Sequence, residues 1–252
     1  MRKTLTVTFL LAGLGLGFAP IALASDAPEN RQTTFARRVE QAVVQGSVAK
    51  LTALRSHLER GGSDLYDLAY VDWRTSQLLP DKSKKEKRKL LKQAQQHLDQ
   101  LLETDSKNAE AHALHGSVIG EQITGMWSGM RLGRKSKKSL DRALELGPDN
   151  PRIALQRGIS FFFTPKSFGG GLPKAEKELR RALDLFAREP SEKPWPNWGH
   201  VDVLVWLGQT LVKAGKPQEA RASYEAALKL EPAHTWVRNE LLPALDDAAK
   251  RK

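Results

Sequence analysis

Apolar and small residues recur every three or four positions along most of the chain, the spacing that places them on one face of an α-helix. Residues 201–234 show it most clearly: one helical pattern ends at a Gly-Lys-Pro turn at 215–217, and a second begins directly after it. The apolar positions of this stretch are Leu204, Leu207, Leu211, Tyr224 and Leu228. The pattern predicts two helices that pack against each other as a hairpin.

Small residues mark the places where these two helices would approach closely. Gly208, Ala220 and Ala227 stand at these positions, and Pro232 follows the second helix. In length and pattern the stretch resembles the tetratricopeptide repeat, although Leu204 and Leu211 replace the aromatic residues of its first helix. The resemblance implies stacked helix pairs that bind a protein or peptide on their concave surface.

A single helix pair cannot bury its own apolar face, so further pairs are expected upstream. Second-helix patterns begin near Ala94, Ser136, Ala175 and Ala220, at spacings of 42, 39 and 45 residues. We therefore predict an all-α fold, a right-handed superhelical solenoid of helix pairs over residues 63–249 that ends in a capping helix. Residues 25–62 form a degenerate first pair in this prediction. Each pair is expected to contact only its neighbours, which would spread unfolding along the array.

Residues 1–24 have the pattern of a secretory signal peptide: two basic residues, a long apolar run, and Ala22-Leu23-Ala24 before Ser25. A permanent membrane anchor is the alternative, but the run is broken by three glycines and Pro20. Cleavage after Ala24 is expected, followed by a soluble chain in a bacterial periplasm without a transmembrane segment. The chain has no cysteine, so it forms no disulfide and carries no lipid on an N-terminal cysteine.

The chain is basic, with a formal net charge of +11. Two basic clusters lie between the helices of a predicted pair, so both would reach the same edge of a stack. They are Lys82, Lys84, Lys85, Lys87, Arg88 and Lys89, and then Arg131, Arg134, Lys135, Lys137 and Lys138. The hypothesis is a basic rim that meets an anionic surface, and the alternative is an ordinary solvated surface. Nucleic acid is not expected as the partner of an exported protein.

No motif for catalysis or cofactor binding stands out. The chain has no G-x-S-x-G sequence, no Walker-type loop, no dinucleotide fingerprint and no cysteine nucleophile. His112 and His115 lie near Glu110, but nothing completes a metal-binding signature around them. We therefore expect no enzyme activity, no cofactor and no metal.

Aromatic residues are concentrated around the predicted helix 172–187. Phe161, Phe162, Phe163 and Phe168 precede it, followed by Gly169, Gly170 and Gly171, and Trp195 and Trp198 lie after it. Both segments are longer than the repeat pattern requires, and they flank the same helix. They are therefore expected to meet and to form a partner-binding surface, because exposed aromatic side chains are common binding hot spots. The alternative is that these residues pack the enlarged loops onto neighbouring helices.

The sequence thus favours a non-enzymatic periplasmic scaffold for protein interaction or assembly. The alternative is a periplasmic receptor, associated with transport, for a small hydrophobic or anionic ligand.

Overall fold

The computed structural model describes residues 31–61, 64–190 and 198–250. All of them belong to one compact unit that spans residues 31–252. The predicted signal peptide and its cleavage site lie outside the described residues, as does Trp195.

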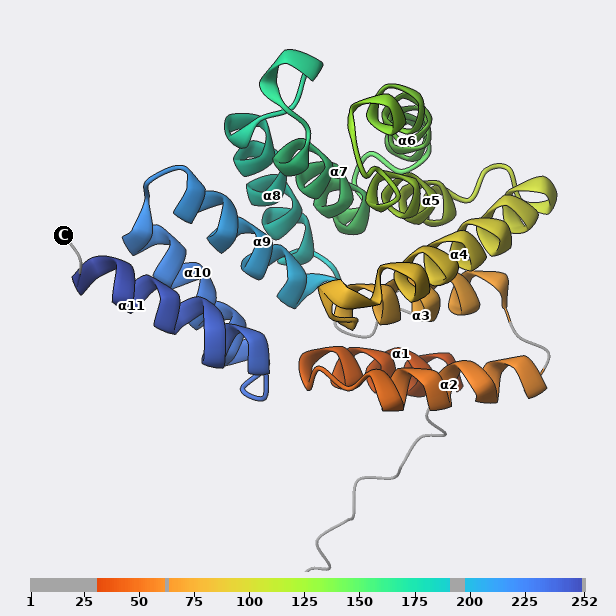
Figure 1. Cartoon of the computed structure of the whole chain (residues 1–252), viewed down its shortest axis with the longest axis horizontal. Helices are drawn as coiled ribbons and strands as arrows, with labels where there is room; N and C mark the ends of the chain where they lie inside the picture. The colour runs from red at the N-terminus through yellow and green to blue at the C-terminus, as the bar shows by residue number, and fades with distance from the viewer. Residues whose placement is uncertain (1–30, 62–63, 191–197, 251–252) are drawn as a thin grey trace, which may run out of the picture. The chain divides into compact units, whose positions relative to one another are not determined.

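The described residues form α-helices joined by short connections, and they contain no strand (Figure 1). Five antiparallel pairs follow one another: α1 (Arg31–Val44) with α2 (Val48–Gly61), α3 (Leu65–Leu78) with α4 (Lys84–Thr104), α5 (Ala109–Glu121) with α6 (Met126–Leu146), α7 (Pro151–Phe163) with α8 (Leu172–Phe186), and α9 (His200–Lys213) with α10 (Pro217–Leu230). The final helix, α11 (Leu242–Lys250), follows the π-helical turn η3 (Val237–Leu241). The predicted all-α repeat of helix pairs is confirmed.

Local sequence signals fix where several first helices begin. The side chains of Asp64, Asn108 and Asn150 accept hydrogen bonds from backbone N–H groups at the starts of α3, α5 and α7. These caps satisfy donors that the helix itself leaves unpaired. Pro173 and Pro217 stand in the first turns of α8 and α10, where a missing N–H costs nothing.

Glycines allow the two helices of a pair to approach closely. A Cβ atom on Gly116 would lie 2.7 Å from Leu140 Cγ, and one on Gly158 would lie 2.7 Å from Leu179 Cγ. Gly208 faces the ring of Tyr224 in the same way. At these positions, therefore, the backbone of the first helix meets a side chain of the second.

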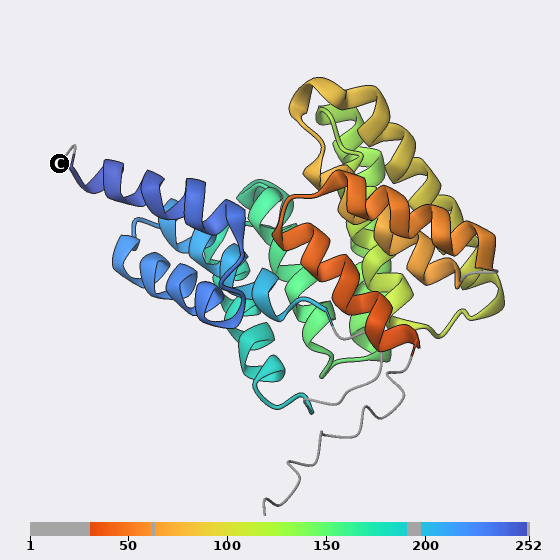
Figure 2. The same ribbon diagram turned by 90° about the horizontal axis from the view of Figure 1, so that it is seen from below.

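The expectation that each pair contacts only its neighbours is wrong. The indole N–H of Trp198, just before α9, donates to the hydroxyl of Tyr66 on α3 across 3.0 Å. Thr235, after α10, donates to the carbonyl of Val44 at the end of α1 across 3.0 Å. Later helix pairs thus contact early pairs directly, so we expect early and late pairs to unfold together. Figures 1 and 2 show α1 and α2 covering α3, with which both are in contact.

Within the described ranges no helix is both long and apolar enough to span a bilayer.

Candidate functional site

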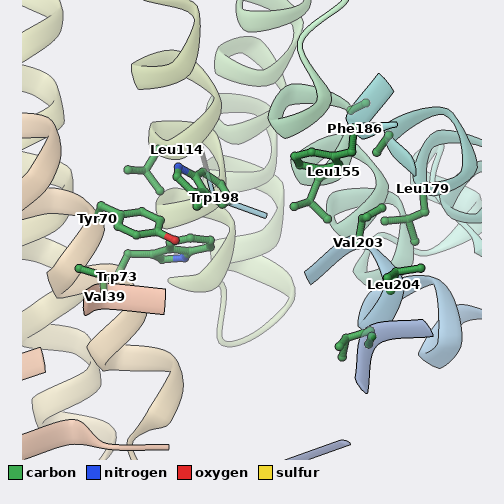
Figure 3. Close-up of a cluster of buried hydrophobic side chains, with 14 of the residues drawn as sticks. Val39, Tyr70, Trp73, Leu114, Leu155, Leu179, Phe186, Trp198, Val203 and Leu204 are labelled. Carbon is green, nitrogen blue, oxygen red and sulfur yellow. The ribbon is translucent and has the colours of Figure 1, made fainter. Parts of the chain in front are cut away.

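Aromatic side chains fill the space between α3 and the segment before α9. Trp198 lies against Tyr70 and Trp73, with ring centroids 5.0 and 5.7 Å apart (Figure 3). It is only 2% exposed. Trp198 is therefore a core residue, which corrects its predicted place on a partner-binding surface: the indole packs inward onto α3 instead of lying over the surface.

A buried charge network ties α1, α3 and α9 together next to this aromatic core. Arg74 donates to Asp202 across 3.1 Å, and its guanidinium lies 5.5 Å from the ring centroid of Trp73. The hydroxyl of Tyr70 donates to Glu40 across 2.5 Å. Burial raises the pKa of Glu40, and the positive charge of Arg74 opposes this shift. These groups bind one another and hold the helices in register.

Arg152, at the start of α7, fixes the segment that carries Trp198. It is fully buried, and its Nε donates to Glu110 across 2.8 Å. It also donates to the carbonyl of Trp198 across 3.0 Å and pairs with Glu189. A buried arginine with this many acceptors has a structural role, so the start of α7 around Arg152 offers no open binding surface.

A second group of aromatic residues, which is accessible, lies where α7 ends beside α9. The ring of Trp206 lies 5.4 Å from that of Phe162 and 5.5 Å from that of Phe163. The ammonium of Lys213 sits 4.1 Å from the ring centroid of Phe162, at cation–π distance. Phe163 is 66% exposed. We call Phe161, Phe162, Phe163 and Trp206 the aromatic cluster.

Cations also border Phe161, the remaining member of the aromatic cluster. The guanidinium of Arg157 lies 5.5 Å from its ring centroid, and the ammonium of Lys174 lies 5.9 Å from it. Arg157 pairs with Asp141 across 3.0 Å, so Lys174 and Lys213 supply the accessible positive charge beside the rings. Apolar rings next to these two cations suit a ligand with apolar groups and a carboxylate or other anion.

The glycine run folds the connection between α7 and α8 back onto the end of α7. The N–H of Gly171 donates to the carbonyl of Phe161 across 2.9 Å, and the N–H of Gly170 donates to that of Pro165 across 3.2 Å. Gly169 and Gly171 have φ values of 87° and 108°, which favour glycine. This tight return leaves Phe168 69% exposed.

Most of the exposed large apolar side chains gather at one edge of the stack. We call this the turn edge: it carries the connections from the first to the second helix of each pair. Seven of the nine such side chains in the described ranges lie in or next to these connections, namely Ile123, Met126, Trp127, Met130, Phe163, Phe168 and Val212. A monomer normally scatters such residues, so the turn edge is a candidate interaction surface.

The basic clusters were predicted to lie between the helices of a pair, but the structure places residues 84–89 in α4 and residues 131–138 in α6. Lys84, Lys85 and Arg88 are exposed on the first turns of α4, and no ion pair engages them in the described structure. Others are partly neutralised: Lys87 pairs with Asp81, Lys135 lies 4.0 Å from Asp99, and Lys137 pairs with Asp141. Arg134 donates to a carbonyl of its own helix, and Lys138 is exposed.

The two histidines considered as metal ligands have other bonds. His112 lies 3.0 Å from the carbonyl oxygen of Ser106, and His115 lies 2.8 Å from Ser139 and 2.9 Å from Asp99. Within the described parts of the chain, no group of three or more potential ligands could hold a metal ion.

Sequence reasoning missed Trp206 and Lys213 and gave Phe163 no separate role. Trp206 and Lys213 are seven positions apart and therefore share a helix face, a signal that the sequence contained. Their proximity to the end of α7 depends on the packing of two helix pairs, which the sequence did not reveal.

Comparisons with known proteins agree with this geometry. Residues 201–234 match the model of the family described as tetratricopeptide repeat. The structure resembles that of HusA, a haemophore from Porphyromonas gingivalis, with 22% identity, coverage of 74% of this chain and 96% of HusA, and a TM-score of 0.59. It also resembles a thermophilic TPR protein from Thermus thermophilus, with 21% identity, coverage of 85% of this chain and 98% of that one, and a TM-score of 0.56. At these identities the likeness concerns the fold. No curated protein sequence matches the chain.

Proposed function

We propose that this protein, which belongs to the tetratricopeptide-repeat proteins, is a non-enzymatic scaffold that binds a protein or peptide segment at the aromatic cluster. One observation carries the proposal: Phe163 is 66% exposed beside Trp206 and the cation of Lys213, on the first helices of two adjacent pairs. Exposed aromatic rings that bridge two rigid helices make suitable anchors for a partner.

The chemistry of the aromatic cluster defines the partner segment. Apolar side chains would pack against Phe163 and Trp206, and a carboxylate would approach Lys213 or Lys174. Phe168 stands on the neighbouring connection and would border the same partner. Trp198 already covers Tyr66 and Tyr70 on α3, so that part of the stack has no room for a partner. Binding would therefore concentrate at the turn edge.

Photo-crosslinking in intact cells tests this site. A photoreactive phenylalanine analogue placed at Phe163 should form one discrete protein adduct. The same analogue at Leu230, which is 49% exposed on α10 away from the turn edge, is the control and should form none. Equal labelling from both positions, or none from Phe163, would argue against a partner at the aromatic cluster.

The proposal includes export to a bacterial periplasm, and the composition of residues 1–24 supports it. N-terminal sequencing of the chain from the periplasmic fraction should begin at Ser25. Recovery of a chain that still begins at Met1 in the membrane fraction would contradict it.

A second candidate is a receptor for a small hydrophobic anion at the same cluster, associated with transport. The ammonium of Lys213 over the ring of Phe162 favours it, since a ligand with an apolar body and an acid group would match both. HusA, which has the same fold, is a haemophore. Native mass spectrometry after gentle purification separates the candidates: a retained small mass supports the receptor, and a co-purified protein supports the scaffold.

A further inference from the structure

Helix α6 extends past the helix with which it pairs. It has 21 residues, whereas α5 has 13. Ser136 donates to the carbonyl of Gly116 across 2.6 Å, which sets the antiparallel register of the two helices. The end of α5 therefore falls about level with residue 131, and the first turn of α6 projects beyond it by roughly 1.5 Å per residue.

This projecting turn is apolar and well ordered. Trp127 is 80% exposed, Met126 is 72% exposed and Met130 is 41% exposed, with Ile123 just before the helix at 38%. The hydroxyl oxygen of Ser128 accepts from the N–H groups of residues 124 and 125 across 3.1 and 3.0 Å, which closes the start of the helix. We call Ile123, Met126, Trp127 and Met130 the α6 tip.

Basic residues follow the α6 tip along the same face. Trp127, Arg131, Arg134 and Lys138 are spaced at i, i+4, i+7 and i+11, so they form one stripe, and all four are exposed. No acidic residue occurs from position 122 to position 140. The stripe thus has an apolar end and a positive collar, which we define as Arg131, Arg134 and Lys138.

A second positive segment reaches the same edge. Gln122, at the end of α5, donates to Gln95 of α4 across 2.8 Å, so the turns of α4 before Gln95 lie beyond this contact. Arg88 is seven residues earlier, roughly 10 Å further toward the edge. The exposed side chains of Lys84, Lys85 and Arg88 therefore add positive charge to the same edge as the α6 tip.

We infer that the α6 tip docks on an anionic lipid bilayer. Tryptophan and methionine would enter the interfacial layer, and the positive collar would meet lipid phosphates. Arg131 follows Met126 by five residues, about 7.5 Å along the helix, within the depth of about 5–10 Å to which interfacial helices bury their apolar groups. A projecting convex tip suits a deformable lipid surface, whereas a protein partner would need a matching acidic groove. The α6 tip shares no residue with the aromatic cluster.

Vesicle binding by the chain that begins at Ser25, without the apolar residues 1–24, tests this inference. The chain should bind vesicles of equimolar phosphatidylglycerol and phosphatidylcholine, bind vesicles of phosphatidylcholine far less, and lose binding as salt rises. Trp127→Ala should weaken binding about tenfold, because it removes the main apolar contact. Arg131→Gln with Arg134→Gln should weaken it roughly 20-fold.

Matched controls separate local from general effects. Lys107→Gln with Lys229→Gln makes the same change in net charge on exposed residues at the opposite edge, and Leu230→Ser removes an exposed apolar side chain there. These variants should bind like the original chain, with unchanged circular dichroism. Absent vesicle binding would overturn the inference, as would equal losses in test and control variants. Binding to soluble polyglutamate without binding to vesicles would overturn it in favour of an acidic protein.

Discussion

At the scale of single residues, glycine sets how closely paired helices approach. Gly208 on α9 faces the ring of Tyr224 on α10, and Gly158 on α7 faces Leu179 on α8. Both positions follow from the repeat pattern, since the sequence places a glycine at the same point in the first helices of the third, fourth and fifth pairs. The sequence therefore predicted this contact type, although it did not supply the distances.

Gly208→Ala should destabilise the fold by about 1–3 kcal/mol, because its Cβ would overlap the Tyr224 ring. Gly133→Ala is the matched control: it lies inside α6, and nothing is within 4 Å of an added Cβ. It should stabilise the helix by about 0.5–1 kcal/mol. Thermal or urea unfolding measures both, and an equal effect of the two changes would contradict the close approach.

His115 gives a prediction about pH. Burial lowers its pKa below the usual 6.5, although Asp99 pulls it upward, and Lys135 and His112 add to the lowering. His115 therefore binds a proton more readily in the unfolded chain than in the folded chain, so the stability of the fold falls as the pH drops below about 6.5.

His115→Gln removes this proton-binding difference. The free energy of unfolding, measured between about pH 7.5 and pH 5, should decline less in His115→Gln than in the original chain. His97, His200 and His234 have pKa values lowered in the same direction, so both chains share their contribution. A steeper decline in the variant would show that protonated His115 is stabilised by Asp99 instead.

At the scale of elements, the aromatic residues before and after α8 differ in exposure, and the sequence did not reveal this difference. Aromatic residues before and after α8 were predicted to form one surface, yet Phe168 is 69% exposed and Trp198 is 2% exposed. The difference arises because Trp198 finds Tyr66 and Tyr70 on a helix far away in sequence. Composition alone does not show whether an aromatic side chain next to a helix lies in solvent or packs into the core.

Trp198→Ala should cost about 3–5 kcal/mol, since it opens a cavity among buried rings. Phe168→Ala should change stability by less than about 0.5 kcal/mol, because its ring is mostly in solvent. Urea unfolding of the two variants provides the comparison. A large loss of stability in Phe168→Ala would show instead that the Phe168 ring is packed in the core.

At the scale of the whole molecule, contacts between distant pairs replace the expected chain of neighbours. Arg74 on α3 binds Asp202 on α9, and Thr235 binds the end of α1. The helix pairs and their order were readable from the sequence, because periodicity is local. These contacts were not, because they join residues 128 and 191 positions apart.

Arg74→Gln should loosen α9 as well as α3, since it leaves the partly buried carboxylates of Asp202 and Glu40 without their cation. Hydrogen exchange should accelerate in both helices. Arg142→Gln is the control, because its pair with Glu145 is local to α6 and exposed. Acceleration confined to α3 and its sequence neighbours would favour an array without long-range coupling.

The central claim is that the aromatic cluster binds a partner segment, and the affinity of the crosslinked partner tests it most directly. Isothermal titration should show that Phe163→Ala and Lys213→Gln each weaken binding about tenfold or more, with melting temperatures nearly unchanged. Leu230→Ala, which changes a 49% exposed apolar side chain on α10, should bind as the original chain does. Unchanged affinity in both cluster variants, or an equal loss in Leu230→Ala, would contradict the account.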